Sequence, residues 1–272
     1  MTFTLGPSLL FCPADRPERY AKAADRSDTV ILDLEDAVAP GDKAAAREAL
    51  ADSANLLDPA RTVVRVNPVG TPDLKLDLAA VAKTPYRTLM LAKAESAEQL
   101  DALAGYQVLA LCETARGVLH SAEIAARPNV LGLMWGAEDL IASLGGTSSR
   151  DTGGQYRAVA LHARSQVLLA AGSFGKAAID AVYVNIPDLE GLTAEAEDAV
   201  ASGFAAKACI HPSQVAAVRA SYRPSEDAVR EARELLEAAA AAGNGVFSHE
   251  GRMIDGPILR HAESVLRRAG QA

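Results

Sequence analysis

Residues Thr29–Asp52 read TVILDLEDAVAPGDKAAAREALAD, and this stretch contains the repeating unit that decides the fold. Its first six residues, Thr29–Leu34, are mainly β-branched or leucine, which is typical of a strand buried in a sheet. From Asp42 onward the residues are mainly alanine, glutamate and arginine, which favour a helix. A buried strand followed by a helix is one βα unit, so the stretch predicts a parallel sheet covered by helices.

The same alternation recurs along the chain of 272 residues, a length that suits one large α/β domain. Eight short apolar runs, each followed by a helical pattern, favour a closed (β/α)8 TIM barrel. A doubly wound sheet is the alternative, but the GxGxxG of a dinucleotide site does not follow the first run. We predict strands at Ser8–Phe11, Thr29–Leu34, Thr62–Val66, Thr88–Leu91, Val108–Leu111, Val130–Met134, Ala181–Val184 and Ala206–Ile210.

The last part of the chain departs from this alternation. Ser225–Ala242 has a long helical pattern that ends at Gly243, and the loop Asn244–Pro257 leads into a second helical segment, Ile258–Arg268. We therefore predict a catalytic TIM-barrel domain over residues 1–220 and a C-terminal helical extension, long enough to form a lid, over residues 221–272.

The charge and the cysteines exclude several classes of protein. A net charge of -8 and a pI near 5.2 argue against a nucleic-acid partner, although a small basic pocket for a phosphorylated ligand remains compatible. Cys12, Cys112 and Cys209 are far apart and lack metal-ligand spacing, which indicates buried thiols in a reducing compartment. No apolar run approaches the roughly 20 residues of a membrane span, and residues 1–10 do not resemble a signal peptide, so we expect a cytoplasmic protein without a membrane partner.

Polar side chains are concentrated where the predicted strands end, which is where (β/α)8 barrels place their functional groups. Glu35 and Asp36 follow the second strand, the third carries Arg65 and is followed by Asn67, and the fifth ends at Glu113; the sixth ends in Gly136, Ala137, Glu138 and Asp139. Carboxylates directed at one point repel one another unless a cation neutralises them, and oxygen ligands favour Mg²⁺, with Mn²⁺ as an alternative. The pattern thus predicts a catalytic divalent-metal site.

Within this site Glu113 and Asp139 come from neighbouring strands and are our candidate metal ligands. Arg65 can bind a substrate carboxylate through two parallel hydrogen bonds, and the backbone N–H groups of Gly136 and Ala137 can bind the same carboxylate. Any one of these charged residues could instead form a structural ion pair, but their convergence from several strands favours a site.

Four further residues have alternative interpretations. Glu35 could orient water held by the metal, and Asp36 could support the site from behind it or begin the next segment. Glu138 is interpreted as structural. His211 ends the eighth strand, but the proline that follows favours a structural hydrogen bond over a catalytic role.

These residues lie in motifs that resemble the citrate lyase β subunit and the stand-alone enzymes of the HpcH/HpaI aldolase group. The resemblance covers nearly the whole chain. Its motifs, in order, are LLFCPADRPERYAKA (Leu9–Ala23), VILDLEDAV (Val30–Val38), VRVNP (Val64–Pro68), ETARGV (Glu113–Val118), LMWGAEDL (Leu133–Leu140), IHPSQ (Ile210–Gln214) and GRMIDGP (Gly251–Pro257).

The resemblance implies a Mg²⁺-dependent lyase on a trimeric or hexameric barrel, with Glu113 and Asp139 as metal ligands and Arg65 on the acid moiety. It also implies that Arg16 and Lys22 contact the phosphates of coenzyme A, and that Asp255 closes over a neighbouring subunit's site and transfers protons. From the sequence alone, Arg16 and Lys22 could equally lie on a solvated helix face, and Asp255 could simply begin a helix.

The expected reaction is cleavage of a 3-hydroxyacyl-CoA, of the citramalyl, malyl or citryl type, into acetyl-CoA and a 2-oxo acid. Aldolases of the group that act on free hydroxy acids use a histidine near the second strand, where this chain has Glu35 and Asp36. An aldolase on free acids, a subunit that acts on a carrier-protein thioester, and a binding subunit without turnover remain the alternatives. A small pocket near Met134 or Trp135 is expected to sort the acyl substituents.

Overall fold

The computed structural model describes residues 3–243, 246–249 and 251–270. The chain divides into two compact units, Met1–Val218 and Arg219–Ala272. The function of residues 221–272 as a lid stays a prediction. Within the described residues, no helix is both long enough and apolar enough to cross a membrane.

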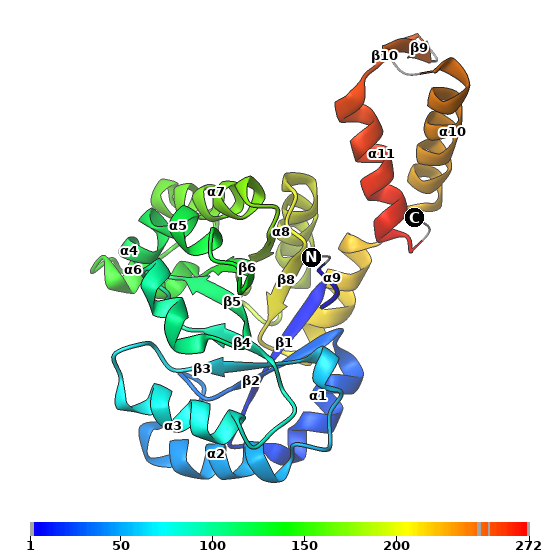
Figure 1. Cartoon of the computed structure of the whole chain (residues 1–272). Helices are drawn as coiled ribbons and strands as arrows, with labels where there is room; N and C mark the ends of the chain where they lie inside the picture. Colours follow the sequence, from blue (N-terminus) through cyan, green and yellow to red (C-terminus); the bar gives the residue numbers. More distant parts are fainter. Residues whose placement is uncertain (1–2, 244–245, 250, 271–272) are drawn as a thin grey trace. The chain divides into compact units, whose positions relative to one another are not determined.

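The first unit is a closed barrel of eight parallel strands in sequence order, in which β1 also pairs with β8 (Figure 1). The predicted (β/α)8 barrel is therefore confirmed, and the doubly wound sheet is excluded, because an open sheet has two edge strands with a neighbour on one side only, whereas each of these strands has two neighbours. The strands are β1 (Ser8–Pro13), β2 (Thr29–Asp33), β3 (Thr62–Val66), β4 (Thr88–Leu91), β5 (Gln107–Cys112), β6 (Val130–Trp135), β7 (Ala177–Asp180) and β8 (Ala206–Cys209).

The predicted seventh strand, Ala181–Val184, is wrong, because β7 lies just before it at Ala177–Asp180. The apolar run AVYV favoured the later position, whereas the alanine-rich β7 has no β-branched pattern and ends in an acid. The Asp180 carboxylate is nevertheless fully buried, since Arg164 and Lys207 each contact it at 2.9 Å. Tertiary ion pairing thus permits a strand that local sequence preference does not indicate.

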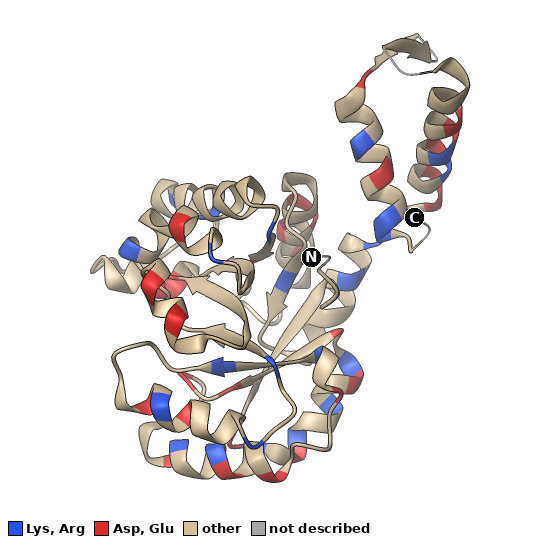
Figure 2. Ribbon diagram, in the orientation of Figure 1, with Lys and Arg blue, Asp and Glu red and all other residues tan. Residues whose placement is uncertain are grey.

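The barrel interior is filled by side chains from all eight strands, among them Leu9, Ile31, Val63 and Met90. Helices surround the strands, and acidic and basic residues are interspersed along them (Figure 2). The segment Ala97–Leu103 is a 3₁₀ helix that begins with a capping box. The α-helices of this part are α1 (Tyr20–Arg26), α2 (Lys43–Asp52), α3 (Pro72–Val81), α4 (Ala115–Leu119), α5 (Ser121–Ala125), α6 (Ala137–Ser143), α7 (Ala158–Ser173), α8 (Leu189–Ser202) and α9 (Val215–Tyr222).

The second unit contains α10 (Glu226–Ala242), the antiparallel strands β9 (Phe247–His249) and β10 (Arg252–Ile254), and α11 (Gly256–Arg268). Both helices were predicted from the sequence and are confirmed. The hydroxyl of Ser225 caps α10 by accepting the N–H of Ala228 at 3.1 Å. The two helices share a small apolar core of Val229, Ala232, Ala262 and Val265.

Candidate active site

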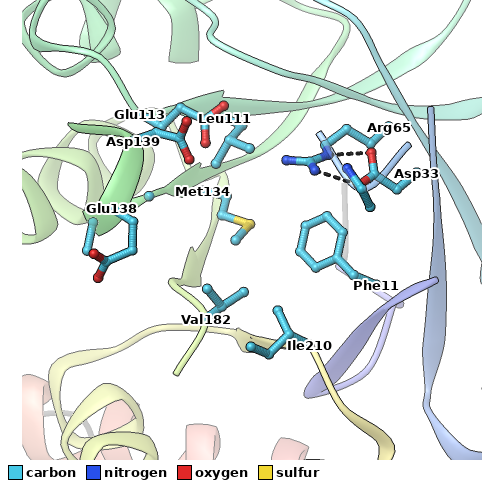
Figure 3. Close-up of a pocket in the computed structure, with 13 residues that line it drawn as sticks. Phe11, Asp33, Arg65, Leu111, Glu113, Met134, Glu138, Asp139, Val182 and Ile210 are labelled. Atoms are coloured by element: carbon cyan, nitrogen blue, oxygen red, sulfur yellow. Dashed lines mark hydrogen bonds and ion pairs between the residues drawn. The ribbon is translucent and has the colours of Figure 1, made fainter. Parts of the chain in front are cut away.

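A cavity of about 190 Å³ opens among residues at the carboxyl ends of the barrel strands. Figure 3 shows Glu113 and Asp139 at one end of this cavity, Arg65 and Asp33 at another, and apolar side chains between them. The lining residues are Phe11, Asp33, Ala37, Arg65, Leu111, Glu113, Met134, Gly136, Ala137, Glu138, Asp139, Val182 and Ile210. Most residues that the sequence singled out at strand ends are therefore brought to one cavity.

Glu113, directly after β5, is buried, whereas the side chain of Asp139 in the first turn of α6 is 40% exposed. Burial, and secondly the nearby negative charge of Asp139, raise the pKa of Glu113 to about 8. A dication between the two groups would offset both effects, because its positive charge stabilises the ionised carboxylates. This pair therefore has the electrostatic character of a cation site.

The local backbone is built around Glu113. A Cβ atom added to Gly136 would lie 2.9 Å from both Cβ and Oε2 of Glu113, so only glycine permits the β6–α6 junction to approach so closely. The donors are carboxylate oxygens, without thiolate or imidazole, which suits Mg²⁺ or Mn²⁺. In the described part of the chain, no group of three or more histidine, cysteine or acidic side chains forms a metal cage. Two protein ligands are common for Mg²⁺, which keeps several waters.

Arg65 is anchored by a partner that the sequence interpretation did not single out. Its Nε and Nη2 donate to Oδ1 and Oδ2 of Asp33 at 2.7 and 2.5 Å, and Nη1 lies 3.2 Å from Oε2 of Glu35. The guanidinium also lies over the ring of Phe11, 4.9 Å from its centre. Asp33 is the first acid of DLED, and its position inside β2 concealed it.

Lys93 is a second residue beside the site that the sequence analysis did not predict. Its Nζ donates to Oε1 of Glu35 at 2.5 Å and to Oδ2 of Asp36 at 3.0 Å. Burial outweighs the opposing effects of Arg65 and Lys93, so the pKa of Glu35 is raised. For Asp36 the balance is reversed: burial is outweighed by Lys93, and the pKa is lowered. Lys93 lies two residues after β4, outside every motif that was predicted to form the site.

A family model described as HpcH/HpaI aldolase/citrate lyase matches residues 7–108 and 103–212 of this chain. The chain belongs to this family. A citrate lyase subunit beta-like protein of Mycobacterium tuberculosis is 58% identical over 267 residues, covering 98% of this chain and 97% of the relative. The mitochondrial citramalyl-CoA lyase of Rattus norvegicus is 30% identical over 290 residues, covering 95% and 84% respectively.

A crystal structure of CitE from Mycobacterium tuberculosis in complex with magnesium, acetoacetate and coenzyme A superimposes with a TM-score of 0.91. That chain is 58% identical, and the match covers 97% of this chain and 98% of the other. The resemblance to the HpcH/HpaI aldolase/citrate lyase family that the motifs predicted is therefore confirmed.

Other residues predicted from the family pattern lie outside the cavity. Arg16 and Lys22 are exposed, Arg16 just after β1 and Lys22 on α1, and Arg16 lies 3.7 Å from the carboxylate of Asp15. Asp255 is the N-cap of α11 and accepts the N–H of Ile258 at 3.4 Å. Their contacts with coenzyme A and substrate stay predictions.

Three residues beside the cavity have structural contacts. Glu138 accepts a hydrogen bond from Ser149 at 2.6 Å, and His211 caps the turn at Pro212–Gln214. Trp135 donates to the buried Asp180 at 2.8 Å and does not line the cavity, whereas its neighbour Met134 does. Of the two residues expected near the acyl substituent, the structure brings Met134 to the cavity.

Proposed function

We propose that this protein is a Mg²⁺-dependent carbon–carbon lyase that cleaves a 3-hydroxyacyl-CoA into acetyl-CoA and a 2-oxo acid. The observation that carries the proposal is the buried Glu113 beside Asp139 in the same small cavity as Arg65. The two carboxylates provide a metal site, and the arginine provides a site for the acid end of the substrate. The magnesium and coenzyme A bound to the mycobacterial relative support the proposal.

Glu113 and Asp139 would hold the metal, which when bound supplies a positive charge that stabilises the oxyanion developing during cleavage. Arg65, fixed by Asp33, would orient the substrate carboxylate, together with the backbone N–H groups of Gly136 and Ala137 at the start of α6. Because Asp33 already holds Arg65 on two nitrogens, the guanidinium is pre-organised before substrate arrives.

The reaction requires one proton to leave and one to return. A base removes the proton of the 3-hydroxyl group, the bond between C2 and C3 breaks, and its electron pair remains on the acetyl-CoA carbon as an enolate. The former hydroxyl carbon becomes the ketone of the 2-oxo acid, and the enolate carbon takes a proton to give acetyl-CoA. Asp255 is our first choice for the proton-transfer group and Glu35 the second.

Two features of the C-terminal unit support a lid that presents Asp255 to a neighbouring subunit. Val246 and Met253, beside and within the β9–β10 hairpin, are each 67% exposed, as suits a segment that packs on another surface. Asp255 follows β10 directly. On the barrel, Leu119 and Leu169 are 71% and 70% exposed, which supports a homo-oligomer, a trimer or hexamer.

Coenzyme A would bind through its phosphates to Arg16 and Lys22, whose exposed side chains are available to a ligand. The three cysteines are buried free thiols, which supports a reducing, cytoplasmic location.

The apolar part of the cavity, which includes Met134, Val182 and Ile210, favours a methyl substituent over a second carboxylate. We therefore rank citramalyl-CoA first, before malyl-CoA and citryl-CoA.

The test is to incubate the purified protein with citramalyl-CoA, malyl-CoA and citryl-CoA, with Mg²⁺ or with excess chelator. Mass spectrometry follows the release of acetyl-CoA and the 2-oxo acid. We expect metal-dependent cleavage of citramalyl-CoA and its loss in Glu113→Ala and Asp139→Ala. Survival of all three thioesters would overturn the proposal, and turnover of free hydroxy acids without coenzyme A would replace it with an aldolase.

A further inference from the structure

Lys93 connects two sets of carboxylates through different parts of the same residue. Its main-chain N–H donates to Oε1 of Glu113 at 3.1 Å. Its Nζ contacts Glu35 at 2.5 Å and Asp36 at 3.0 Å, and lies 3.6 Å from Oδ1 of Asp139. One residue therefore contacts both proposed metal ligands and both acids that follow β2.

The backbone of Lys93 is in the left-handed region, with a φ of 49°. Among the described residues it is the one non-glycine residue with a positive φ. This conformation is unfavourable for a residue with a Cβ atom and persists only where the surroundings impose it. Here it allows the N–H to reach Glu113 while the side chain reaches Glu35.

The charges around Lys93 do not balance. Four acids, Asp33, Glu35, Asp36 and Asp139, pair with Arg65 and Lys93, and the fifth, Glu113, accepts the main-chain N–H of Lys93. Arg65 pairs with Asp33 and with Oε2 of Glu35. The ammonium of Lys93 pairs with Asp36 and with Oε1 of Glu35. A dication without Lys93 would meet four acids on one rim rather than two.

We propose that Lys93 is a positioning residue that decides which carboxylates bind the metal. Its ammonium neutralises Glu35 and Asp36, which leaves Glu113 and Asp139 as the acids that attract Mg²⁺, and its main chain holds one oxygen of Glu113. This inference rests on the proposed metal site. It assigns Glu35 and Asp36 to the counter-ion of Lys93 rather than to the metal.

The test replaces the ammonium without shortening the side chain. Lys93→Met keeps an unbranched chain and removes the charge. Mn²⁺ should therefore bind about tenfold more tightly, because a positive charge that repels the ion from a few ångströms away is lost. In this variant Glu35 and Asp36 should also bind the ion and draw it away from its catalytic position. We therefore expect kcat to fall at saturating metal, while the KM for substrate changes little. Mn²⁺ titration of the full chain by electron paramagnetic resonance gives the affinity and the number of ions, and the spectrum reports their surroundings.

Three further variants separate charge from backbone and from folding. Lys93→Arg keeps the charge and should restore the wild-type Mn²⁺ affinity and spectrum. Lys93→Asn removes the charge in a residue that tolerates the left-handed region, so it should behave like Lys93→Met even if that variant folds poorly. Lys83→Met changes an exposed lysine outside the cavity and should leave both affinity and kcat unchanged.

The outcomes distinguish this inference from the proposed function. Unchanged or weaker Mn²⁺ binding in both Lys93→Met and Lys93→Asn overturns the role of Lys93, while the lyase stands if the wild type cleaves its thioester. A wild-type protein that binds neither Mn²⁺ nor Mg²⁺ overturns the metal site and the role of Lys93 with it.

Discussion

Two clusters of mostly buried charged residues lie in the barrel unit, one with equal numbers of acids and bases and the other with more acids than bases. Outside the barrel wall, Asp180, Glu195 and Asp198 pair with Arg150, Arg164 and Lys207 at 2.5 to 2.9 Å, three acids with three bases. At the strand ends, Asp33, Glu35, Asp36 and Asp139 pair with Arg65 and Lys93, and Glu113 is a fifth acid beside them. The first cluster is complete by itself, whereas the second has excess negative charge. Buried charge alone does not indicate a functional site; an unbalanced sum does.

The largest expected effect removes an acid from the unbalanced cluster. Glu113→Gln keeps the size of the side chain and removes a carboxylate, so metal-dependent turnover should fall by at least about 10³-fold. The folded protein should lose no stability, because the neutral amide needs no proton in order to be buried beside Asp139. Steady-state kinetics and urea unfolding measure the two effects. A stable variant with near-normal turnover would contradict the metal-ligand role.

The reciprocal change breaks the balanced cluster. Lys207→Met leaves the fully buried Asp180 with one fewer cation, so the free energy of unfolding should fall by about 3–5 kcal/mol. Metal affinity should be unchanged in the molecules that remain folded. Denaturant unfolding with a parallel Mn²⁺ titration checks both. A variant as stable as the wild type would show that this network contributes little to folding.

The two clusters should also respond differently to ions. Mg²⁺ at 100 times its Kd should stabilise the wild-type protein by about 2.7 kcal/mol through mass action, because it binds the folded state. Glu113→Gln should gain almost nothing. Thermal unfolding at several Mg²⁺ concentrations measures this, with NaCl of equal ionic strength as the control. Equal stabilisation of both proteins would place the ion elsewhere.

The smallest expected effect is the release of a proton when Mg²⁺ binds. The metal-free folded protein keeps Glu113 protonated up to about pH 8, whereas the unfolded chain releases this proton near the ordinary glutamate pKa of 4.5. The contribution of Glu113 to the free energy of unfolding therefore declines as the pH rises from 4.5 to about 8. Mg²⁺ binding at neutral pH should therefore release close to one proton, and almost none well above pH 8. Calorimetry in buffers of different ionisation enthalpy counts the protons. No proton release at neutral pH would show that Glu113 is already ionised.

Local patterns in the sequence predicted most of the fold. Strands β1 to β6 have β-branched or leucine-rich sequences, because a strand buried on both faces needs such residues, and β8 was predicted although its sequence, AKAC, lacks them. The exception, β7, depends on Asp180 meeting Arg164 and Lys207, which are distant in sequence. No local pattern records such a partnership, so the predicted strand begins at Ala181, directly after the residue at which β7 ends.

The candidate site was predicted unevenly for a related reason. Glu113 and Asp139 were found because parallel strands bring their carboxyl ends to one edge. Asp33 was missed because it lies within a strand, and Lys93 because its chemistry depends on a left-handed backbone that lysine does not indicate. The role proposed for Asp255 would require a contact with another subunit, which the physics of one chain cannot specify.

The close approach of Gly136 to Glu113 has a consequence for how such a protein can evolve. A glycine codon becomes an alanine codon through a single base change, and the added methyl carbon would lie 2.9 Å from the Cβ of Glu113. Glu113 and Gly136 follow the last paired residues of β5 and β6, so we expect this single substitution to disturb the metal site while the strand pairing is kept. Descendants with alanine here would be natural candidates for barrels that have exchanged catalysis for another role.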